Sequence, residues 1–300
     1  MGSAAILFIF LCILLLGFLW LQQSLSRDGF DDAMKPMYLV WRGLKEEGLH
    51  KNGFGDKLRG ALAMHQYCSA HNIPLIVDAT EDVCGKFLKF VRSKSFEDSI
   101  QDQPVHQISQ FLNLEEELNA LALPNHVITN HFPNTPLSEE DKTFGKFICT
   151  PTPELQLLID QTKSYLPVDY SIQHFRFNDD VFKKDVESSD PLFQKYIELL
   201  QSSYQPNDVL LSNSNNFKKQ AKELLGIATI PCWDDTDFCE LGHIGLSNNE
   251  TAVKQSFLEF FVIAGATSIQ TYTCYSWESN FVMWTRIIHN IPSENHIVEV

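Results

Sequence analysis

Residues 37–78 of this 300-residue chain contain a strand, a glycine turn, a helix and a second strand, and this order restricts the fold more than any other feature. Residues 37–42 and 74–78 are short apolar runs, which indicate buried strands. Residues 56–71 carry apolar side chains at helical spacing. Because a strand–helix–strand unit returns the chain in the same direction, this segment predicts a parallel sheet covered by helices.

The second half of the chain repeats the alternation of strands and helices. Residues 168–177 alternate polar and apolar side chains, a period of two that is typical of a strand. Pro167 ends a helix predicted over residues 151–166, and we place a domain boundary there. Further strands are expected at 125–130, 208–211, 227–230 and 267–273, and further helices at 108–121, 191–204, 215–225, 250–264 and 278–289. The pattern predicts an α/β fold of two Rossmann-like domains, residues 37–166 and 167–300, facing a cleft.

Residues 4–21 form an uncharged apolar stretch that just reaches the length of a membrane-spanning helix. No small-x-small cleavage site follows it, which favours an uncleaved anchor over a signal peptide. Residues 22–36 are polar and charged and are expected to form a short stem. Because no Lys or Arg precedes the span and Arg27 follows it among acids, the positive-inside rule does not fix the orientation.

Seven cysteines are present, and one of them, Cys12, lies in the apolar stretch. The other six are an even number, which fits disulfide bonds in an oxidising compartment. The alternative is that several are small buried apolar residues. Cys232 and Cys239 are close enough in sequence to pair across a loop. The six are Cys68, Cys84, Cys149, Cys232, Cys239 and Cys274, and one glycosylation sequon begins at Asn249.

The net charge of −15 argues against a nucleic-acid-binding protein and draws attention to each arginine at a strand end. On a strand over 168–177, His174 and Arg176 share one face with Asn178, and Asp179 follows. Because a guanidinium offers a planar fork of donors, this arrangement suits a phosphate. The alternative interpretation is the exposed polar face of an edge strand.

A glycine turn precedes the helix predicted at 56–71, with Gly53, Gly55 and Gly60 around Asp56. Glycine lets the backbone approach a ligand, and the start of a helix presents amide donors to an anion. The turn lacks the spacing of a dinucleotide-binding motif or a P-loop. Alternatively, it is only a tight turn in which Asp56 caps the helix.

Two later strands also end in residues that suit a nucleotide site. Ser212 and Ser214 follow the strand at 208–211, where hydroxyls can hold a ribose or a phosphate, although capping would also explain them. Ser279 stands at a helix start, and Phe281 could pack near a base; a capped helix with a buried Phe fits equally well. Residues 235–237 read Asp-x-Asp, which could bind a divalent ion or form a solvated acidic turn.

In order and spacing, three of these segments resemble the GDP-fucose-dependent fucosyltransferases, which include the nodulation α1,6-, the α1,2- and the protein O-fucosyltransferases. The segments are residues 53–60 (GFGDKLRG), 174–179 (HFRFND) and 279–281 (SNF). The resemblance spans roughly residues 37–290. The chain departs from the family pattern at Asn178, where a glycine is common, and at Asp56, where some members have Asn.

The resemblance implies a glycosyltransferase of the GT-B type with the donor in the C-terminal domain. It implies that Arg176 binds the β-phosphate of GDP and stabilises the leaving group without a metal. His174 and Asp179 would shape the donor pocket, and Asp56 could be the general base of an inverting reaction. The further donor-site candidates are Ser212, Ser279 and Phe281.

The expected function is therefore transfer of L-fucose from GDP-fucose to a glycan or protein. We expect a single-pass type II membrane protein that faces the lumen of the Golgi or ER and does not bind nucleic acid. Two alternatives remain open. One is a metal-dependent transferase that uses another nucleotide sugar through Asp235 and Asp237. The other is a non-catalytic luminal relative that kept the fold.

Overall fold

The computed structural model describes residues 36–41, 53–79, 82–89, 105–121, 126–232 and 249–299. The expected anchor over 4–21 and nearly all of the stem lie outside these residues, as do Asp235, Asp237 and Cys239. Within the described ranges, no helix combines the length and the apolar character needed to cross a membrane.

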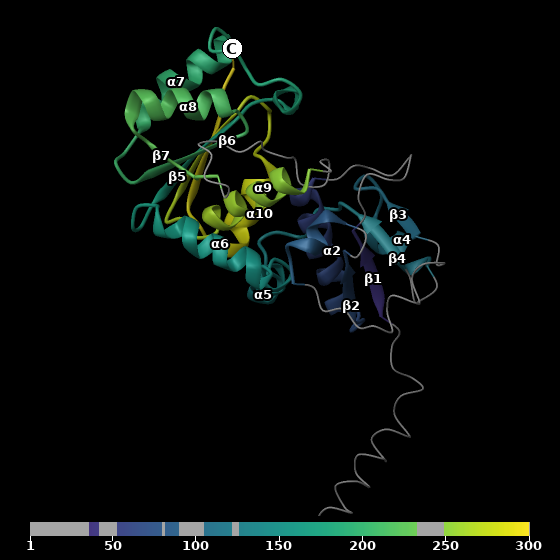
Figure 1. The fold of residues 1–300 in the computed structure, drawn as a ribbon. Coiled ribbons are helices and arrows are strands. Elements are labelled where there is room, and N and C mark those ends of the chain that lie inside the picture. The colour runs from purple at the N-terminus through teal and green to yellow at the C-terminus, as the bar shows by residue number, and fades with distance from the viewer. Residues whose placement is uncertain are drawn as a thin grey trace, which may run out of the picture.

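The first half contains a parallel sheet in the order β2-β1-β4-β3. Helix α2 (Phe54–Ala70) connects β1 (Met37–Val40) to β2 (Leu75–Asp78), so the predicted strand–helix–strand unit is confirmed. The other two strands are β3 (Val105–Ile108) and β4 (His126–Thr129). Figure 1 shows this sheet and α2 on one side of the molecule.

The second half contains a parallel sheet in the order β7-β6-β5-β8-β9. Its strands are β5 (Ser171–Arg176), β6 (Asp208–Ser212), β7 (Ala228–Thr229), β8 (Ile269–Thr273) and β9 (Ser293–Ile297). The chain moves outward from β5 to β7 and then continues on the other side of β5 with β8. This reversal between β5 and β8 is a topological switch point, where open α/β sheets bind ligands beyond the carboxyl ends of the strands.

Helices from the second half pack against the first half. Helix α9 (Glu250–Ile263) contacts α6 (Pro153–Ser164), and α10 (Asn280–His289) contacts α2 and α5 (Glu139–Ile148). Figure 1 shows α9 and α10 between the two sheets, whereas α7 (Pro191–Ser203) and α8 (Asn215–Leu225) lie far from the first sheet. One apolar core therefore includes side chains of both halves: the ring centroid of Phe54 lies 5.1 Å from those of Phe257 and Phe260.

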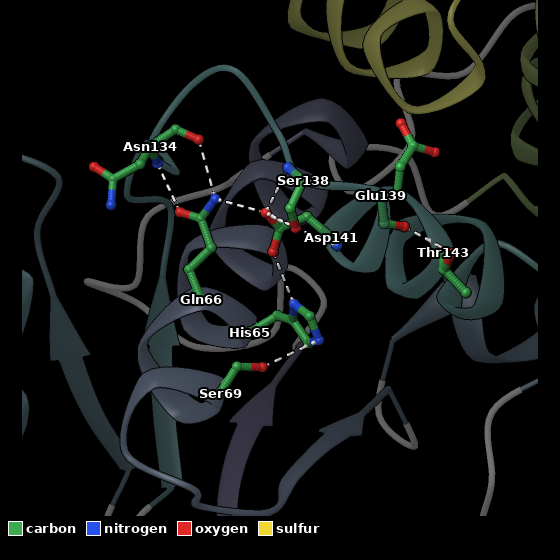
Figure 2. A network of polar contacts seen from close by, with 8 residues as sticks. All are labelled: His65, Gln66, Ser69, Asn134, Ser138, Glu139, Asp141 and Thr143. Carbon is green, nitrogen blue, oxygen red and sulfur yellow. Dashed lines mark hydrogen bonds and ion pairs between the residues drawn. The ribbon is translucent and has the colours of Figure 1, made fainter.

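A polar network fixes α5 against α2 (Figure 2). Asp141 accepts hydrogen bonds from the Gln66 side chain at 3.0 Å and from Ser138, with which it forms a capping box. Its other oxygen lies 3.0 Å from His65 Nδ1, and Ser69 Oγ lies 3.5 Å from His65 Nε2. Ser69 lies in the last turn of α2, where carbonyl groups are exposed and not amide donors, so this helix end offers no oxyanion donors to the Ser–His–Asp group. We therefore interpret the cluster as a structural contact between α2 and α5.

Several predicted elements differ from those observed. The helix predicted over 108–121 is wrong at its start, because residues up to Ile108 form β3 and the side chain of Asn113 caps α4 (Leu114–Asn119). Helix α5 and strand β9 were not predicted. The capping box at Ser138 signals α5, whereas β9 is a mostly polar edge strand without a clear alternation.

The expected set of disulfide bonds among six cysteines is wrong for four of them. Cys68, Cys84, Cys149 and Cys274 are free thiols, and the first three are buried. Burial raises the pKa of the Cys68 thiol to about 12, so this group is a small apolar residue at neutral pH. The suggested pairing of Cys232 with Cys239 involves a residue outside the described ranges.

Candidate functional site

A pocket with a volume of about 250 Å³ lies where the carboxyl ends of β5, β6 and β8 meet the N-termini of α2 and α10. Residues from both halves of the chain line it. Nine residues that were predicted for the site come together here: Gly53, Gly55, Asp56, His174, Arg176, Asp179, Ser212, Ser279 and Phe281.

Gly60, the tenth predicted residue, does not line the pocket. It lies inside α2, where an added Cβ would be 2.1 Å from the carbonyl oxygen of Thr129 at the end of β4. The third glycine of the predicted turn therefore allows α2 to pack closely on the first sheet, and its inclusion in a ligand-binding turn is corrected.

Arg176 ends β5 and is held on several sides. Its guanidinium forms an ion pair with the Asp179 carboxylate and lies 5.2 Å from the centre of the Phe182 ring. Its backbone carbonyl accepts a hydrogen bond of 2.9 Å from the Tyr196 hydroxyl. The side chain is only 14% exposed. Because its surroundings fix its position, the guanidinium meets an incoming anion with little loss of conformational freedom.

The loop after β5 is tied to neighbouring strands. Asn213 accepts from the Phe177 amide at 2.9 Å and donates back to the Phe177 carbonyl at 3.0 Å. The Asp179 amide donates to the Tyr275 hydroxyl at 3.1 Å. Asn178 lies beyond the end of β5 and accepts from the Asp180 amide as the cap of a short 3₁₀ turn, Asp179–Phe182. Its predicted place on the strand face with Arg176 is wrong.

His174 is buried in the same face of β5. Burial, together with the charge of Arg176, lowers the pKa of its imidazole to about 3, so the ring is neutral at physiological pH. Its Nδ1 has no hydrogen-bond partner among the described residues. A neutral ring with an unpaired nitrogen can hydrogen-bond a ligand in the pocket, because each ring nitrogen either donates or accepts.

The depressed pKa of His174 predicts a loss of stability in acid. As pH falls from about 6.5 towards 3, the unfolded chain binds a proton that the folded chain cannot, which costs about 1.4 kcal/mol per pH unit. We therefore expect His174→Gln to move the midpoint of acid unfolding to lower pH, measured by tryptophan fluorescence. The variant should still lose some stability in acid, because burial also lowers the pKa of His289, to about 4. His71→Gln, which removes an exposed histidine, is the control. The prediction is contradicted if the acid-unfolding curves of His174→Gln and His71→Gln superimpose.

The two helices that begin at the pocket lack side-chain caps. Gly53, the N-cap of α2, has no side chain that could accept a bond, and the hydroxyl of Ser279, the N-cap of α10, accepts none from the first turn. Every other α-helix in the described residues has such a cap. First-turn amides of α2 and α10 are therefore available to an anion, and both helix dipoles favour negative charge here.

Asp56 lies in the first turn of α2, with one oxygen in use. Its Oδ1 accepts from Asn280 Nδ2 at 2.9 Å and lies 3.3 Å from Arg59 Nη2. Its Oδ2 has no partner among the described residues. Because Asn280 belongs to α10, this contact joins the two halves of the chain beside the pocket. The carboxylate is held by one oxygen and has the other available as a proton acceptor.

The hydroxyl candidates have different roles. Ser212 Oγ accepts from the Ser214 amide at 3.1 Å, while Ser214 caps α8 through the Phe217 amide. Ser279 lines the pocket at the start of α10, so the structure brings this predicted residue to the site. Phe281 packs against Phe260, with 5.7 Å between the ring centroids, and it also lines the pocket.

Sequence reasoning missed Glu259, a buried acid of α9 that lines the pocket. It lies 3.7 Å from the buried Lys218 ammonium of α8. Burial raises the pKa of Glu259 and lowers that of Lys218, while their attraction opposes both shifts. The available signal was a single acid in the middle of the apolar stretch 257–263. A buried acid in a pocket is a candidate functional residue.

An aromatic pair was also missed. Tyr275 and Trp277 follow β8 and stack with centroids 5.1 Å apart. Trp277 is 60% exposed although it lines the pocket. Among the described residues, no group of three or more His, Cys, Asp or Glu side chains could hold a metal ion. The pocket is thus built from one arginine, two uncapped helix ends, the buried acid Glu259, the more exposed acids Asp56 and Asp179, and aromatic rings.

No protein-family model matches the sequence, and no curated protein matches it. Its fold is similar to that of several solved GDP-fucose fucosyltransferases. A NodZ α-1,6-fucosyltransferase soaked with GDP-fucose is 12% identical, with a TM-score of 0.54 over 85% of this chain and 93% of that one. The fucosyltransferase NodZ from Bradyrhizobium is 13% identical, with a TM-score of 0.52 over 84% of this chain and 93% of that one. A mutant of Arabidopsis thaliana FUT1 in complex with GDP is 11% identical, with a TM-score of 0.53 over 92% and 74%.

Proposed function

We propose that this chain is a glycosyltransferase that moves L-fucose from GDP-fucose to a hydroxyl group of a glycan or protein, with inversion and without a metal. The observation that carries the proposal is the position of Arg176 in a pocket where two uncapped helix N-termini meet. The similarity of fold to GDP-fucose fucosyltransferases supports the choice of donor.

Arg176 would stabilise the departing GDP. When the bond between fucose and the β-phosphate breaks, negative charge develops on the phosphate oxygens. A fixed guanidinium and first-turn amides favour that charge without reorganising during the reaction, which is commonly the largest single contribution to catalysis. Together they supply the charge stabilisation for which other transferases use a bound cation. Asp179 and Phe182 would hold the guanidinium in place.

Asp56 would be the general base. It comes from α2 in the first half, whereas Arg176 comes from β5 in the second half. A base and a leaving-group site that come from different halves of the chain suit direct displacement, in which the acceptor attacks the face opposite to the phosphate and the fucose carbon inverts. The unpaired Oδ2 would accept the proton of the attacking hydroxyl, provided that it comes within hydrogen-bond reach.

Glu259 would recognise the guanine base. The Watson–Crick edge of guanine carries two adjacent donors, N1–H and the N2 amino group, and a carboxylate can accept from both. Lys218 favours the ionised form of Glu259, which burial alone would disfavour. His174, which is neutral, and Ser212 and Ser279 would make the remaining polar contacts with the donor, while Phe281 would pack beside it.

Glu259→Gln is expected to weaken GDP binding by about tenfold to a hundredfold, because bonds to charged groups contribute about 1.5–3 kcal/mol each. Calorimetry with GDP and with inosine diphosphate, which lacks the N2 amino group, measures the base contact itself. The wild type should prefer GDP, and the variant should lose most of that preference. Ser256→Ala, on the same helix, should retain it. An unchanged ratio of the two affinities in Glu259→Gln would rule out the base contact.

The proposal includes the arrangement of the whole chain. Residues 37–166 would form the acceptor-side domain and residues 167–300 the donor-side domain of a GT-B enzyme. Residues 4–21 would anchor the chain as a type II protein facing the Golgi or ER lumen, with residues 22–36 as the stem. Protease digestion of intact microsomes tests this orientation, because a luminal domain is protected until detergent is added.

The decisive experiment measures GDP release from GDP-fucose by the full chain in detergent, with UDP-sugars as the comparison. We expect release from GDP-fucose alone, at a rate that excess EDTA does not change. Loss of activity with EDTA and its recovery with Mn²⁺ would contradict the proposal and favour the metal-dependent transferase through Asp235 and Asp237. Failure to bind GDP or UDP by calorimetry would favour a non-catalytic relative.

A further inference from the structure

A second feature lies beside Asp56, at the carboxyl ends of β3 and β4. The two loops that follow these neighbouring strands are joined by a 2.6 Å contact between His131 Nε2 and the Leu112 carbonyl oxygen. They carry three exposed apolar side chains, which we call the acceptor patch: Phe111 (87% exposed), Leu112 (46%) and Phe132 (54%). Exposed apolar groups gathered at strand ends mark a ligand surface more often than scattered ones do.

Arg59 connects this patch to the pocket. Its guanidinium carbon lies 4.0 Å from the centre of the Phe132 ring. Its Nη2 lies 3.3 Å from Asp56 Oδ1 and donates to Gln110 Oε1. Arg59 is 5% exposed, and its Nε has no partner among the described residues. One buried cation therefore positions both the candidate base and an exposed aromatic ring.

We propose that the acceptor patch binds a neutral sugar ring, so that the acceptor of the proposed fucosyl transfer is a glycan. The proposal rests on the function given above. Arg59 covers one face of Phe132 and draws the ring into position, which leaves the other face for the ligand. The C–H groups on one face of a pyranose carry partial positive charge and pack on the electron-rich face of an aromatic ring.

The polar surroundings also suit an uncharged sugar. The charge of Arg59, the cation in contact with Phe132, is balanced by Asp56, so this described part of the surface does not favour an acidic group. The side-chain NH₂ group of Gln110 donates to none of the described residues and is half-buried beside Arg59, where it can meet a sugar hydroxyl. Trp277, which is exposed and lines the pocket, offers a second ring to a bound oligosaccharide.

The transfer balances with groups already described. The acceptor oxygen forms a bond to the fucose anomeric carbon, while the bond from that carbon to the β-phosphate oxygen breaks. The electron pair of the broken bond leaves with GDP, next to Arg176, and the proton of the acceptor hydroxyl passes to Asp56 Oδ2. The patch contributes no chemistry; it holds the ring so that one hydroxyl lies next to Asp56.

The test compares Phe132→Ala with the wild type in the full chain. GDP release from GDP-fucose is measured without acceptor, with a panel of neutral oligosaccharides, and with serine- and threonine-containing peptides. We expect oligosaccharides to accelerate release in the wild type. Phe132→Ala should raise KM for the oligosaccharide about tenfold, in keeping with loss of an aromatic contact and its buried area, with a smaller change in kcat. Phe132→Trp, which keeps an aromatic face, should return KM for the oligosaccharide to near the wild-type value.

Phe147→Ala is the matched control, because Phe147 is 52% exposed on α5 and does not line the pocket. It should leave KM unchanged. Acceptor-free hydrolysis and GDP affinity should be the same in all variants, and they report on the donor function alone. If hydrolysis is present but peptides accelerate release and no oligosaccharide does, or if Phe132→Ala matches Phe147→Ala, the glycan proposal fails while the donor function stands. If the wild type neither hydrolyses GDP-fucose nor binds GDP, the glycan proposal and the proposed donor function are both wrong.

Discussion

Arg176→Ala is expected to lower kcat for transfer from GDP-fucose by about 10²–10³-fold, the loss that follows removal of one preorganised group that stabilises a developing charge. The guanidinium is the cation of β5 that lines the pocket, and the two uncapped helix ends remain in the variant. Residual activity should therefore survive. KM for the donor should rise less than kcat falls, because the charge on the phosphate grows as the bond breaks.

Arg176→Lys separates charge from geometry. Lysine keeps the positive charge but not the planar fork, so activity between that of the wild type and that of alanine is expected. Lys183→Ala is the control for general charge, because Lys183 is 81% exposed in the neighbouring turn and pairs only with Asp180 among the described residues. The variants should unfold at similar temperatures. Near-normal turnover by Arg176→Ala in a folded protein would remove Arg176 from the leaving-group site.

Local sequence patterns were sufficient to predict elements whose residues carry their own signals. Helix α8 was predicted over its observed residues, and Gly226 ends it in the left-handed conformation with φ of 65°. The alternation around His174 predicted β5, and the order of strands and helices predicted parallel sheets. The carboxyl ends of parallel strands lie at one edge of a sheet, so the predicted positions of Arg176 and Ser212 after such strands were consistent with a shared site, and the structure places β5 next to β6.

The parts that could not be predicted depend on contacts between distant segments. Glu259 is unremarkable in sequence and becomes informative only when α9 lies beside Lys218 and the pocket. Asn178 fits the strand alternation, but the chain leaves the sheet after Arg176 and uses the asparagine to cap a turn. Arg59 joins Phe132 to Asp56 only because Gly60 lets α2 pack on the end of β4.

Gly55→Ala is expected to abolish GDP-fucose turnover and to weaken GDP binding severely. A Cβ at this position would lie 2.6 Å from the backbone carbon of Asn280 and 2.7 Å from the amide nitrogen of Phe281. Backbone atoms cannot rotate away as a side chain can, so the starts of α2 and α10 must separate. Their separation would break the contact between Asp56 and Asn280 and would displace the start of α10, which lines the pocket. Overpacking of this kind typically costs about 1–3 kcal/mol of stability.

A loss of stability alone would not establish that the pocket depends on this contact, so Gly226→Ala is the matched control. Gly226 has a positive φ of 65° and open space around it, which means that alanine there adds backbone strain of about 1 kcal/mol without a clash. The control should unfold at lower temperature yet bind GDP like the wild type. Gly55→Ala should lose binding even well below its unfolding temperature. If both variants bind GDP equally well, the close approach of the two helix ends is a packing feature and not part of the donor site.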